Sequence, residues 1–548
     1  MNNAVRYTFE NSKSEEAVPF LITPGRGKTA LHSLVDPKRE AQRLISQISS
    51  DTGFLIFLGL GGGFAQEAAL DMTSAQIVVI DFDKEGIDQL FSGRNYSKLL
   101  NSGRFSLLVD QKNDDIKNFI LDNYKPSLAG GIRIIPLRAR IEHDRERFEN
   151  VTKTIEDTID IITGDYSVQA HFGIRWFSNI IRNVKNLDML RDTHRAAPLS
   201  GFMEFKKKAA DKVKKTAIAA AGPSLDFQLT SLAQMKADNV FIICCDTALG
   251  ALLQHGIEPD AVVSIDCQHI SYYHFMGSSI QKKIQNIPLI LDIASPPLLS
   301  GFSASPLFFA SAHPLARYLC ASFLPFTQLD TSGGNVTYTC LSLAESLGAQ
   351  RITLFGADFS YVGNQTYARG TYINPYFSRR QNRLSPLEAQ MSSFLYRSPF
   401  LPAAGSENKN YYETSSLRFY REKLEEKIST MAAIVECAKG FGAPVRVRSG
   451  ELGVGSEELG VRSDKKYLSG MDFLAQYSDD IASLPQAKDS GDYLKTLNAK
   501  EKQVFTTLLP FAAAVRKRNP QLTAKDLIEE VKRQSISDCH RVQTEAAL

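Results

Sequence analysis

A series of short apolar runs between residues 215 and 358 constrains the fold of this chain more than any other feature of its sequence. Each run has the length of a strand, several end in a small or acidic residue, and stretches of helical periodicity separate them. This alternation predicts an α/β fold, in which helices cover both faces of a mostly parallel sheet. Ligands of such sheets bind at the carboxyl ends of the strands. The runs are Lys215–Ala221, Val240–Asp246, Ala261–Asp266, Pro288–Ile293, Leu307–Ala312 and Ile352–Asp358.

The region before this series contains the same pattern with a glycine-rich turn. The apolar run Phe54–Leu58 leads into Gly59-Leu60-Gly61-Gly62-Gly63, and a helical segment is then followed by a second apolar run that ends in Asp81. Strand, glycine turn, helix, strand and terminal acid is the order of a Rossmann unit. Because the glycine spacing is not G-x-G-x-x-G, we interpret this region as an accessory Rossmann-like domain rather than as a dinucleotide or S-adenosylmethionine site.

The length of the chain, 548 residues, is too great for one ordinary domain. We expect residues 1–195 to form the N-terminal Rossmann-like domain with a helical bridge, and residues 196–450 to form the central α/β domain. Residues 451–548 are predicted to be a helical C-terminal region.

Charge, hydropathy and cysteine content exclude several classes of protein. The 63 basic and 60 acidic residues give a formal net charge of +3, too balanced for nucleic acid as the main partner. No apolar run has the roughly 18–20 residues of a membrane helix, and the N-terminus lacks the apolar segment of a signal peptide. The 7 cysteines are scattered without C-x-x-C spacing, which argues for a reducing compartment. We therefore expect a cytoplasmic protein without a membrane span, whose oligomeric state the sequence leaves open.

The first candidate binding segment is Gly222-Pro223-Ser224, which follows the first apolar run of the central region. Glycine permits close approach of the backbone, proline fixes φ, and the serine hydroxyl with neighbouring N–H groups can bind a phosphate oxygen. A β-turn with a serine or aspartate helix cap explains the same residues equally well.

Asp246 and Asp266 each end an apolar run. Acids at strand ends converge on one crevice, where they suit ribose hydroxyls or a magnesium ion. Helix capping is the alternative, and it fits Asp246 better than Asp266, which leads into the polar and aromatic loop Cys267–Phe275.

Two further candidate segments follow in the chain. Ser332, Gly333 and Gly334 precede a predicted helix, whose N-terminal N–H groups form an anion site, although an N-cap loosened by glycine is an alternative. Asp358 and Tyr361 close another run and lead into a loop rich in Tyr, Arg and Gly, which suits a cover over a bound sugar or base.

Taken in order, these segments resemble the central domain of the motility-associated factor proteins. Those proteins are bacterial flagellin glycosyltransferases that attach nonulosonic acids, pseudaminic or legionaminic, to Ser or Thr of flagellin. The domain is also similar to archaeal 6-hydroxymethylpterin diphosphokinase and, more distantly, to bacterial sialyltransferases that use CMP-sialic acid. The resemblance covers about residues 190–450 and is carried by Gly222-Pro223-Ser224-Leu225, Gly256-Ile257-Glu258-Pro259-Asp260, Ser264-Ile265-Asp266, Gly333-Gly334-Asn335-Val336 and Gly356-Ala357-Asp358.

This resemblance implies a Rossmann-like, GT-A-like domain of the sialyltransferase type. It implies transfer of a nonulosonic acid from a CMP-activated donor to flagellin, in flagellar assembly and motility, with no firm cofactor and with metal dependence left open. The candidate catalytic residues are Asp266, Asp358 and Glu413. The residues it assigns to the donor and its nucleotide are Gly222, Pro223, Ser224, Asp246, Ser332, Gly333, Gly334 and Tyr361.

The sequence departs from the sialyltransferases in one respect. They carry a catalytic histidine in a segment that corresponds to Asn410–Ser415, where this chain has none. Two other functions remain as alternatives: a pyrophosphokinase-like enzyme that uses ATP and magnesium on a small heterocycle, and a non-catalytic flagellin-binding protein. The general base is left open among Glu413, Asp266, Asp358, His269, His274 and His313.

Overall fold

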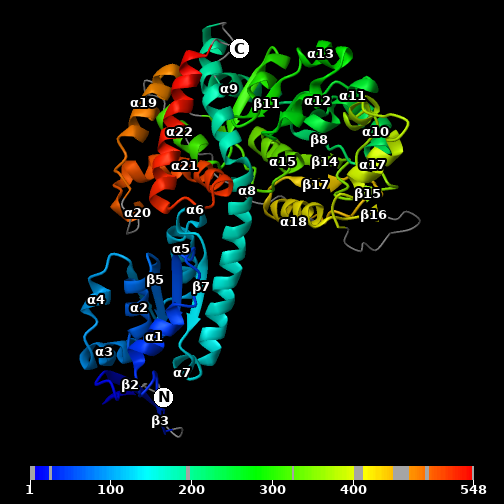
Figure 1. Cartoon of the computed structure of the whole chain (residues 1–548). Helices are drawn as coiled ribbons and strands as arrows, with labels where there is room; N and C mark the ends of the chain where they lie inside the picture. Colours follow the sequence, from blue (N-terminus) through cyan, green and yellow to red (C-terminus); the bar gives the residue numbers. More distant parts are fainter. Residues whose placement is uncertain are drawn as a thin grey trace. The chain divides into compact units, whose positions relative to one another are not determined.

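The computed structural model of the chain describes residues 6–23, 27–192, 198–323, 326–399, 411–447, 468–487 and 493–545 (Figure 1). The chain divides into two compact units. Unit 1 consists of Met1–Ile174 and Asp480–Ile536, and unit 2 of Arg175–Asp479 and Ser537–Leu548. Each contains a parallel sheet flanked by helices, so the predicted α/β fold with two Rossmann-like regions is confirmed.

The sheet of unit 1 has the order β6-β5-β4-β7 and is parallel throughout. All residues of β4 are buried, because this strand is central and has apolar layers on both faces. The strands are β4 (Phe54–Leu58), β5 (Gln76–Asp81), β6 (Phe105–Val109) and β7 (Ile132–Pro136). The helices that accompany them are α2 (Phe64–Met72), α3 (Lys84–Gly93), α4 (Ser97–Leu100), α5 (Asn113–Asn123), α6 (Pro126–Ala129) and α7 (Arg138–Ile141).

A three-stranded antiparallel sheet precedes β4. It consists of β1 (Arg6–Asn11), β2 (Ala17–Thr23) and β3 (Gly27–Ala30), and α1 (Pro37–Ile45) follows it. Asp36 caps α1 by accepting a hydrogen bond from the Arg39 amide, and proline at the first helical position favours the same start. The backbone N–H of Tyr7 in β1 donates to Gln89 Oε1 in α3 at 2.8 Å, which ties this sheet to the Rossmann-like part of unit 1.

The helical C-terminal residues divide between the units and do not form the separate region 451–548 expected from the sequence. The long helix α8 (Arg145–Asp192) also contributes to both units, which places the boundary inside the predicted helical bridge. A helix joins whichever core buries its apolar face, and sequence periodicity does not identify that core. The remaining helices here are α19 (Gly470–Ala482), α20 (Tyr493–Thr496), α21 (Ala499–Arg518) and α22 (Ala524–Thr544).

Unit 2 contains an eight-stranded sheet with the order β13-β12-β11-β10-β9-β8-β14-β17. Its strands are parallel, and β8–β12 and β14 coincide with the apolar runs in the sequence. The chain order reverses at β8, because the later strands β14 and β17 lie on its other side. The bounds are β8 (Lys215–Ala219), β9 (Phe241–Cys245), β10 (Ala261–Ser264), β11 (Leu289–Asp292), β12 (Pro306–Ala310), β13 (Thr327–Gln328), β14 (Arg351–Phe355) and β17 (Ile434–Cys437).

Helices surround this sheet, and a small ribbon of β15 (Tyr361–Val362) and β16 (Tyr411–Tyr412) follows β14. Helix α15 (Val336–Leu347) begins after its cap Asn335 and ends at Gly348, whose φ of 93° suits glycine. No helix within the described ranges is long and apolar enough to cross a membrane. The other helices are α9 (Pro198–Ala209), α10 (Leu225–Ala237), α11 (Leu249–Gln254), α12 (Tyr272–Phe275), α13 (Ser278–Ile284), α14 (Pro314–Ser322), α16 (Ile373–Ser378), α17 (Leu387–Leu395) and α18 (Ser415–Thr430), with short 3-10 turns at Asp246–Ala248, His269–Ser271 and Pro297–Phe302.

Candidate functional site

The carboxylate of Asp246 lies at the carboxyl end of β9 and is only 1% exposed. Its Oδ1 accepts hydrogen bonds from the Thr247 amide at 2.6 Å and from Thr247 Oγ1 at 3.0 Å. Its Oδ2 accepts one from Ser264 Oγ, at the end of β10, at 2.7 Å. These contacts fix the carboxylate across the ends of two adjacent strands.

Asp266 follows β10 and is only half-buried. Its Oδ1 accepts a hydrogen bond from the Gln268 amide at 2.9 Å, and its Oδ2 one from Gln268 Nε2 at 3.4 Å. Burial raises the pKa of Asp266 above the usual carboxyl value, and the nearby Asp246 carboxylate adds to the increase. A carboxyl group with a raised pKa and an accessible oxygen suits proton exchange with a ligand.

His274 on α12 belongs to the same part of the sheet edge. It is 8% exposed, its Nε2 lies 3.5 Å from Thr247 Oγ1, and its Nδ1 is buried with no hydrogen-bond partner within the described residues. Its charged form is close enough to lower the pKa of Asp266. The ring of Tyr372 meets its imidazole edge to face at 4.7 Å.

Tyr367 and Tyr372, in the loop after β15, extend this cluster. Burial raises the pKa of Tyr367 to about 12, and the Asp246 and Asp266 carboxylates contribute to the increase. The same loop approaches Gly222-Pro223-Ser224, because the Ala368 amide donates to Ala221 O at 2.9 Å. Sequence reasoning identified the loop as aromatic-rich but did not single out either tyrosine, since no local pattern shows which rings turn toward the sheet edge.

Gly222, Ser224 and Asp358 meet just beyond the carboxyl ends of the paired strands β8 and β14. The Ser224 amide donates to Asp358 Oδ2 at 2.7 Å, and Ser224 Oγ accepts a hydrogen bond from the Phe441 amide at 2.8 Å. A Cβ on Gly222 would lie 2.3 Å from Asp358 Oδ2, so only glycine permits this approach. Ser224 and Asp358 are 2% and 4% exposed, and Pro223 is also buried. The serine side chain makes no cap hydrogen bond to α10, which rules out the serine-cap alternative.

Ser332, Gly333 and Gly334 form the turn before α15. A Cβ on Gly333 would lie 2.1 Å from the Tyr338 ring, and Gly334 has a φ of 69° and lies against the Tyr420 ring. Ser332 Oγ lies 3.2 Å from the hydroxyl oxygen of Tyr338. The turn is thus shaped by two aromatic rings, while Ser332 and Gly334 remain exposed.

The N-terminus of α15 reaches the end of β9. Thr337 Oγ1, in the first turn of the helix, lies 3.6 Å from Cys245 Sγ. The carboxylate of Asp266 contributes to the raised pKa of Tyr420, the ring that lies against Gly334. The predicted anion turn and the strand-end acids therefore share one edge of unit 2.

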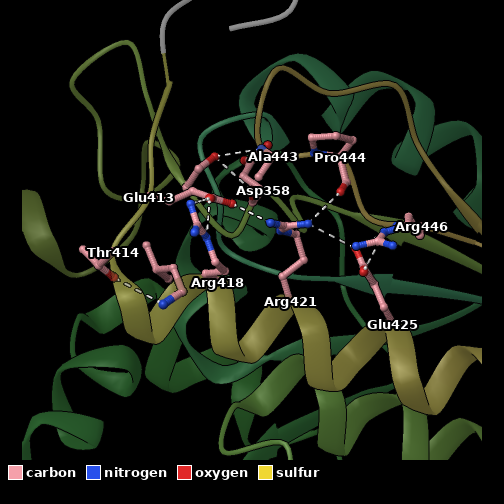
Figure 2. Close-up of polar contacts among 11 residues, drawn as sticks. Asp358, Glu413, Thr414, Arg418, Arg421, Glu425, Ala443, Pro444 and Arg446 are labelled. Carbon is pink, nitrogen blue, oxygen red and sulfur yellow. Dashed lines mark hydrogen bonds and ion pairs between the residues drawn. The ribbon is translucent and has the colours of Figure 1, made fainter. Parts of the chain in front are cut away.

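Glu413 lies in an ion-pair network beside α18 (Figure 2). Its Oε1 accepts a hydrogen bond from Arg421 Nη2 at 2.9 Å, and its Oε2 lies 3.1 Å from Arg418 Nη2. Its side chain is 5% exposed. Arg421 also contacts Glu425 at 3.3 Å and the carbonyl oxygen of Pro444 at 3.5 Å. Two guanidinium groups thus hold the Glu413 carboxylate, which suits an anchor for the start of α18.

The other candidate bases lie in different surroundings. His269 is exposed and stacks on Tyr272, with ring centroids 5.8 Å apart. His313 caps α14 by accepting a hydrogen bond from the Leu315 amide, and burial lowers its pKa to about 4. Asn410, the first residue of the segment that corresponds to the sialyltransferase histidine, lies outside the described residues.

The predicted site residues therefore form two connected groups and one separate network. Asp246 and Asp266 gather with His274 near the turn before α15, and Tyr361 contributes to the raised pKa of Tyr367 above them. The second group lies just beyond the carboxyl ends of β8 and β14 and consists of Gly222, Pro223, Ser224 and Asp358. Glu413 belongs to the network on α18. In the part of the chain that the structure describes, no three His, Cys, Asp or Glu side chains are grouped to hold a metal ion.

In the glycine-rich turn of unit 1, two backbone amides and the terminal acid have partners within the protein, beside a cavity lined by His32, Gly59 and Leu60. His32 Nε2 accepts a hydrogen bond from the Gly62 amide at 2.7 Å, and Asp81 Oδ2 accepts one from the Leu60 amide at 3.1 Å. Asp81 also pairs with Arg140 at 2.7 Å, and both side chains are 1% exposed. A Cβ on Gly59 would lie 2.9 Å from the Arg140 side chain. The acid and the amides that would hold a dinucleotide are occupied, which supports the accessory interpretation.

Comparisons with known proteins agree with this arrangement at the level of the fold. A family model described as 6-hydroxymethylpterin diphosphokinase MptE-like matches residues 181–364, the segment that contains β8–β14. A solved structure, the Maf glycosyltransferase from Magnetospirillum magneticum AMB-1, superposes with a TM-score of 0.53 at 13% identity. The similarity covers 98% of this chain and 90% of that chain.

This chain has the fold of a Maf glycosyltransferase. The resemblance to motility-associated factor proteins seen in the sequence is therefore confirmed for the fold.

Three uncharacterized proteins of Treponema pallidum (strain Nichols) are similar in sequence over shorter stretches. One is 43% identical over 96 residues, which are 17% of this chain and 34% of that protein. A second is 28% identical over 124 residues, which are 23% of this chain and 52% of that protein. A third is 23% identical over 252 residues, which are 45% of this chain and 51% of that protein. The matched part of the chain thus spans about a third to a half of the length of these relatives.

We predict that the glycine-rich turn of unit 1 binds neither NAD nor S-adenosylmethionine, because the Leu60 and Gly62 amides and the Asp81 carboxylate already have partners. Calorimetric titration of the full chain should give no saturable heat with either compound. A saturable signal that Asp81→Asn abolishes would contradict this expectation.

A second prediction concerns Asp292, which ends β11 and is 5% exposed. Burial raises its pKa from 3.8 to about 6, so the folded chain binds this proton more tightly than the unfolded chain. Its stabilising contribution is complete below pH 3.8 and is lost as the pH rises through about 6. At about 1.4 kcal/mol per pKa unit, the loss is roughly 3 kcal/mol.

Asp292→Asn should therefore unfold at the same temperature as the wild type near pH 4 and at a higher one near pH 8. The measurement is thermal unfolding at both pH values, with the exposed Asp238→Asn as the control in the same unit. Equal destabilisation of Asp292→Asn at both pH values would show that the carboxyl is not protonated in the folded chain at low pH.

Proposed function

We propose that this chain is a cytoplasmic glycosyltransferase that moves a nonulosonic acid from a CMP-activated donor to Ser or Thr hydroxyls of flagellin. The observation that carries the proposal is the edge of unit 2 where Asp246 and Asp266 end adjacent strands, beside the start of α15. The Maf glycosyltransferase fold supports a transferase. The donor and the acceptor follow from the sequence resemblance and await the experiments below.

In the proposed reaction, the bond between the sugar carbon and the phosphate oxygen of CMP breaks with its electron pair leaving on the phosphate. A new bond forms from that carbon to the acceptor oxygen, and the hydroxyl proton passes to a base. Ser332 and Gly334 are exposed at the start of α15, and their amides donate within the turn, to Asp330 Oδ1 at 2.9 Å and to Thr331 O at 3.0 Å. We therefore assign the developing phosphate charge to the positive end of the α15 dipole beside this turn. CMP-sugar is here a substrate, and no step is assigned to a metal ion.

We assign the proton transfer to Asp266. Its pKa is raised by burial. Within the described part of the chain, its carboxylate accepts hydrogen bonds only from neighbouring Gln268 and so retains lone pairs for an acceptor hydroxyl. Asp246 is held by Thr247 and Ser264 and suits an orienting role toward ribose hydroxyls. Burial is the main cause of the raised pKa of Asp266, and the Asp246 carboxylate adds to the increase. His274, whose Nδ1 is buried and unpartnered among the described residues, opposes it.

Asp358 and Glu413, which the sequence analysis offered as catalytic candidates, fit supporting roles better. Asp358 accepts the Ser224 amide at 2.7 Å and thereby holds the Gly222-Pro223-Ser224 turn. Glu413 is paired with Arg421 at 2.9 Å and with Arg418 at 3.1 Å. Neutralising either acid by protonation would leave buried donors or cations without their partner, which opposes a role in proton transfer.

A pyrophosphokinase-like activity on a small heterocycle is the second candidate, because the family model that matches residues 181–364 is described by that reaction. The two candidates differ in the nucleotide that the sheet edge binds. Transfer from a CMP-sugar requires cytidine recognition, whereas pyrophosphoryl transfer requires ATP with magnesium.

We predict that CMP raises the unfolding temperature of the full chain and that ATP with magnesium does not. A ligand present at about 100 times its dissociation constant stabilises a fold by about 2.7 kcal/mol, which is easily measured in a thermal-shift assay. UMP is the matched control for base recognition. Protection by ATP with magnesium alone would favour the pyrophosphokinase, and no response to any nucleotide would favour a non-catalytic flagellin-binding protein.

We further predict that Asp266→Ala and Asp266→Asn lower the transfer rate by about 100-fold or more while the protein stays folded, because neither side chain accepts a proton. The measurement is the mass of flagellin in cells that carry each variant. Asp83→Ala in unit 1, which loses only the cap of α3, is the control and should glycosylate normally. Normal glycosylation with Asp266→Ala would refute the assignment, and partial activity of Asp266→Asn would indicate an orienting role instead.

A further inference from the structure

Helix α8 presents two buried asparagines to the sheet edge of unit 2. Asn179 is 7% exposed and Asn183 is 0% exposed. Residues four apart on a helix lie on the same face, so both amides point toward the same neighbouring loops. An asparagine amide carries two donor hydrogens on one nitrogen, and each can serve a different carbonyl oxygen.

Asn179 joins two loops through that single nitrogen. Its Nδ2 donates to Cys267 O at 3.1 Å and to Ala294 O at 2.8 Å. Cys267 belongs to the loop after β10, and Ala294 to the loop after β11. Because both of these residues are buried, the two carbonyls depend on the protein for a donor.

Asn183 makes the same kind of contact with one loop only. Its Nδ2 donates to Ile293 O at 2.8 Å and to Ser295 O at 2.8 Å, both in the loop after β11. Among the described residues, its amide makes no hydrogen bond to the loop that follows β10. The two asparagines are therefore alike in chemistry, burial and helix, but they differ in the loop that each one holds.

The loop after β10 is the one that carries Asp266, the residue immediately before Cys267. Within the loop, the Gln268 amide donates to Asp266 Oδ1 at 2.9 Å, and Ser271 Oγ donates to Asp266 O at 3.2 Å. These bonds fix the shape of the loop but not its place in the unit. The bonds from Asn179 connect the carbonyl of Cys267, the residue after Asp266, with helix α8 and with the loop after β11.

We infer that Asn179 is a positioning residue: by bridging the carbonyls of Cys267 and Ala294 it sets where the Asp266 carboxylate lies in the donor site. This inference rests on the proposed function. A displacement of about 1 Å in a reacting group can cost about 100-fold in rate, so the place of the loop that carries Asp266 matters for transfer.

The test compares Asn179→Ala with the matched control Asn183→Ala. Each variant removes an amide with two donors, so both should lower the unfolding temperature by a similar amount. We expect Asn179→Ala to lower kcat for sugar transfer about tenfold or more, with the KM for the CMP-sugar changed less than about threefold. Asn183→Ala should leave both kinetic constants within about threefold of the wild type.

Hydrogen exchange supplies a readout that does not depend on activity. In Asn179→Ala, the amides of residues 266–271 should exchange faster than in the wild type, whereas in Asn183→Ala they should not. If Asn179→Ala yields too little folded protein, Asn179→Ser keeps one donor and should give an intermediate kcat and intermediate exchange.

Equal loss of kcat in Asn179→Ala and Asn183→Ala, or unchanged exchange of residues 266–271 in Asn179→Ala, would overturn the positioning role. A wild type that binds no CMP and transfers no sugar would instead overturn the proposed function. The two failures are distinguishable, because the exchange difference between the variants persists only if Asn179 anchors the loop.

Discussion

The reversal of strand order at β8 is the constraint on which the candidate site depends. The connections after β8 and β14 leave on opposite sides of the sheet, which opens a crevice at their carboxyl ends. Here the buried bond from the Ser224 amide to Asp358, at 2.7 Å, closes the crevice with the protein's own groups. The half-buried acid lies two strands away, where Asp266 follows β10, beside the buried Asp246 after β9.

Surroundings rather than residue type distinguish the acidic candidates. The Asp246 carboxylate accepts hydrogen bonds from Thr247 and Ser264, and the Asp358 carboxylate accepts one from the Ser224 amide. The Glu413 carboxylate forms ion pairs with two arginines. Within the described residues, the Asp266 carboxylate is hydrogen-bonded only inside its own loop. Burial raises the pKa of both Asp266 and Asp358, but Asp358 is 4% exposed whereas Asp266 is half-buried. A carboxylate whose oxygens are taken up by buried partners is poorly placed to accept a proton from a ligand, whereas a half-buried one is well placed.

The surroundings also explain the glycines of the two glycine-rich turns. In unit 1, the space beside Gly59 and Gly61 contains Arg140, Leu137 and His32. In unit 2, Gly333 and Gly334 make room for the Tyr338 and Tyr420 rings. Glycine in these turns is required because a side chain or another backbone segment approaches closely, and that requirement is the same whether or not a ligand also binds. A glycine motif in the sequence therefore predicts a close approach but does not identify what approaches.

The sequence by itself determined the elements and their polarity. Apolar runs of strand length predicted β8–β12 and β14, and the acids at their ends predicted that Asp246 and Asp266 would share an edge, because these properties depend on residues close in the chain. The tertiary structure decided which polar groups have hydrogen-bond or ion-pair partners within the protein. Ser224 with Asp358, Glu413 with Arg421 and Asn179 with Cys267 and Ala294 are pairs whose partners come from other elements. The same holds for the division of the C-terminal helices between the units, since only packing shows which core buries an apolar face.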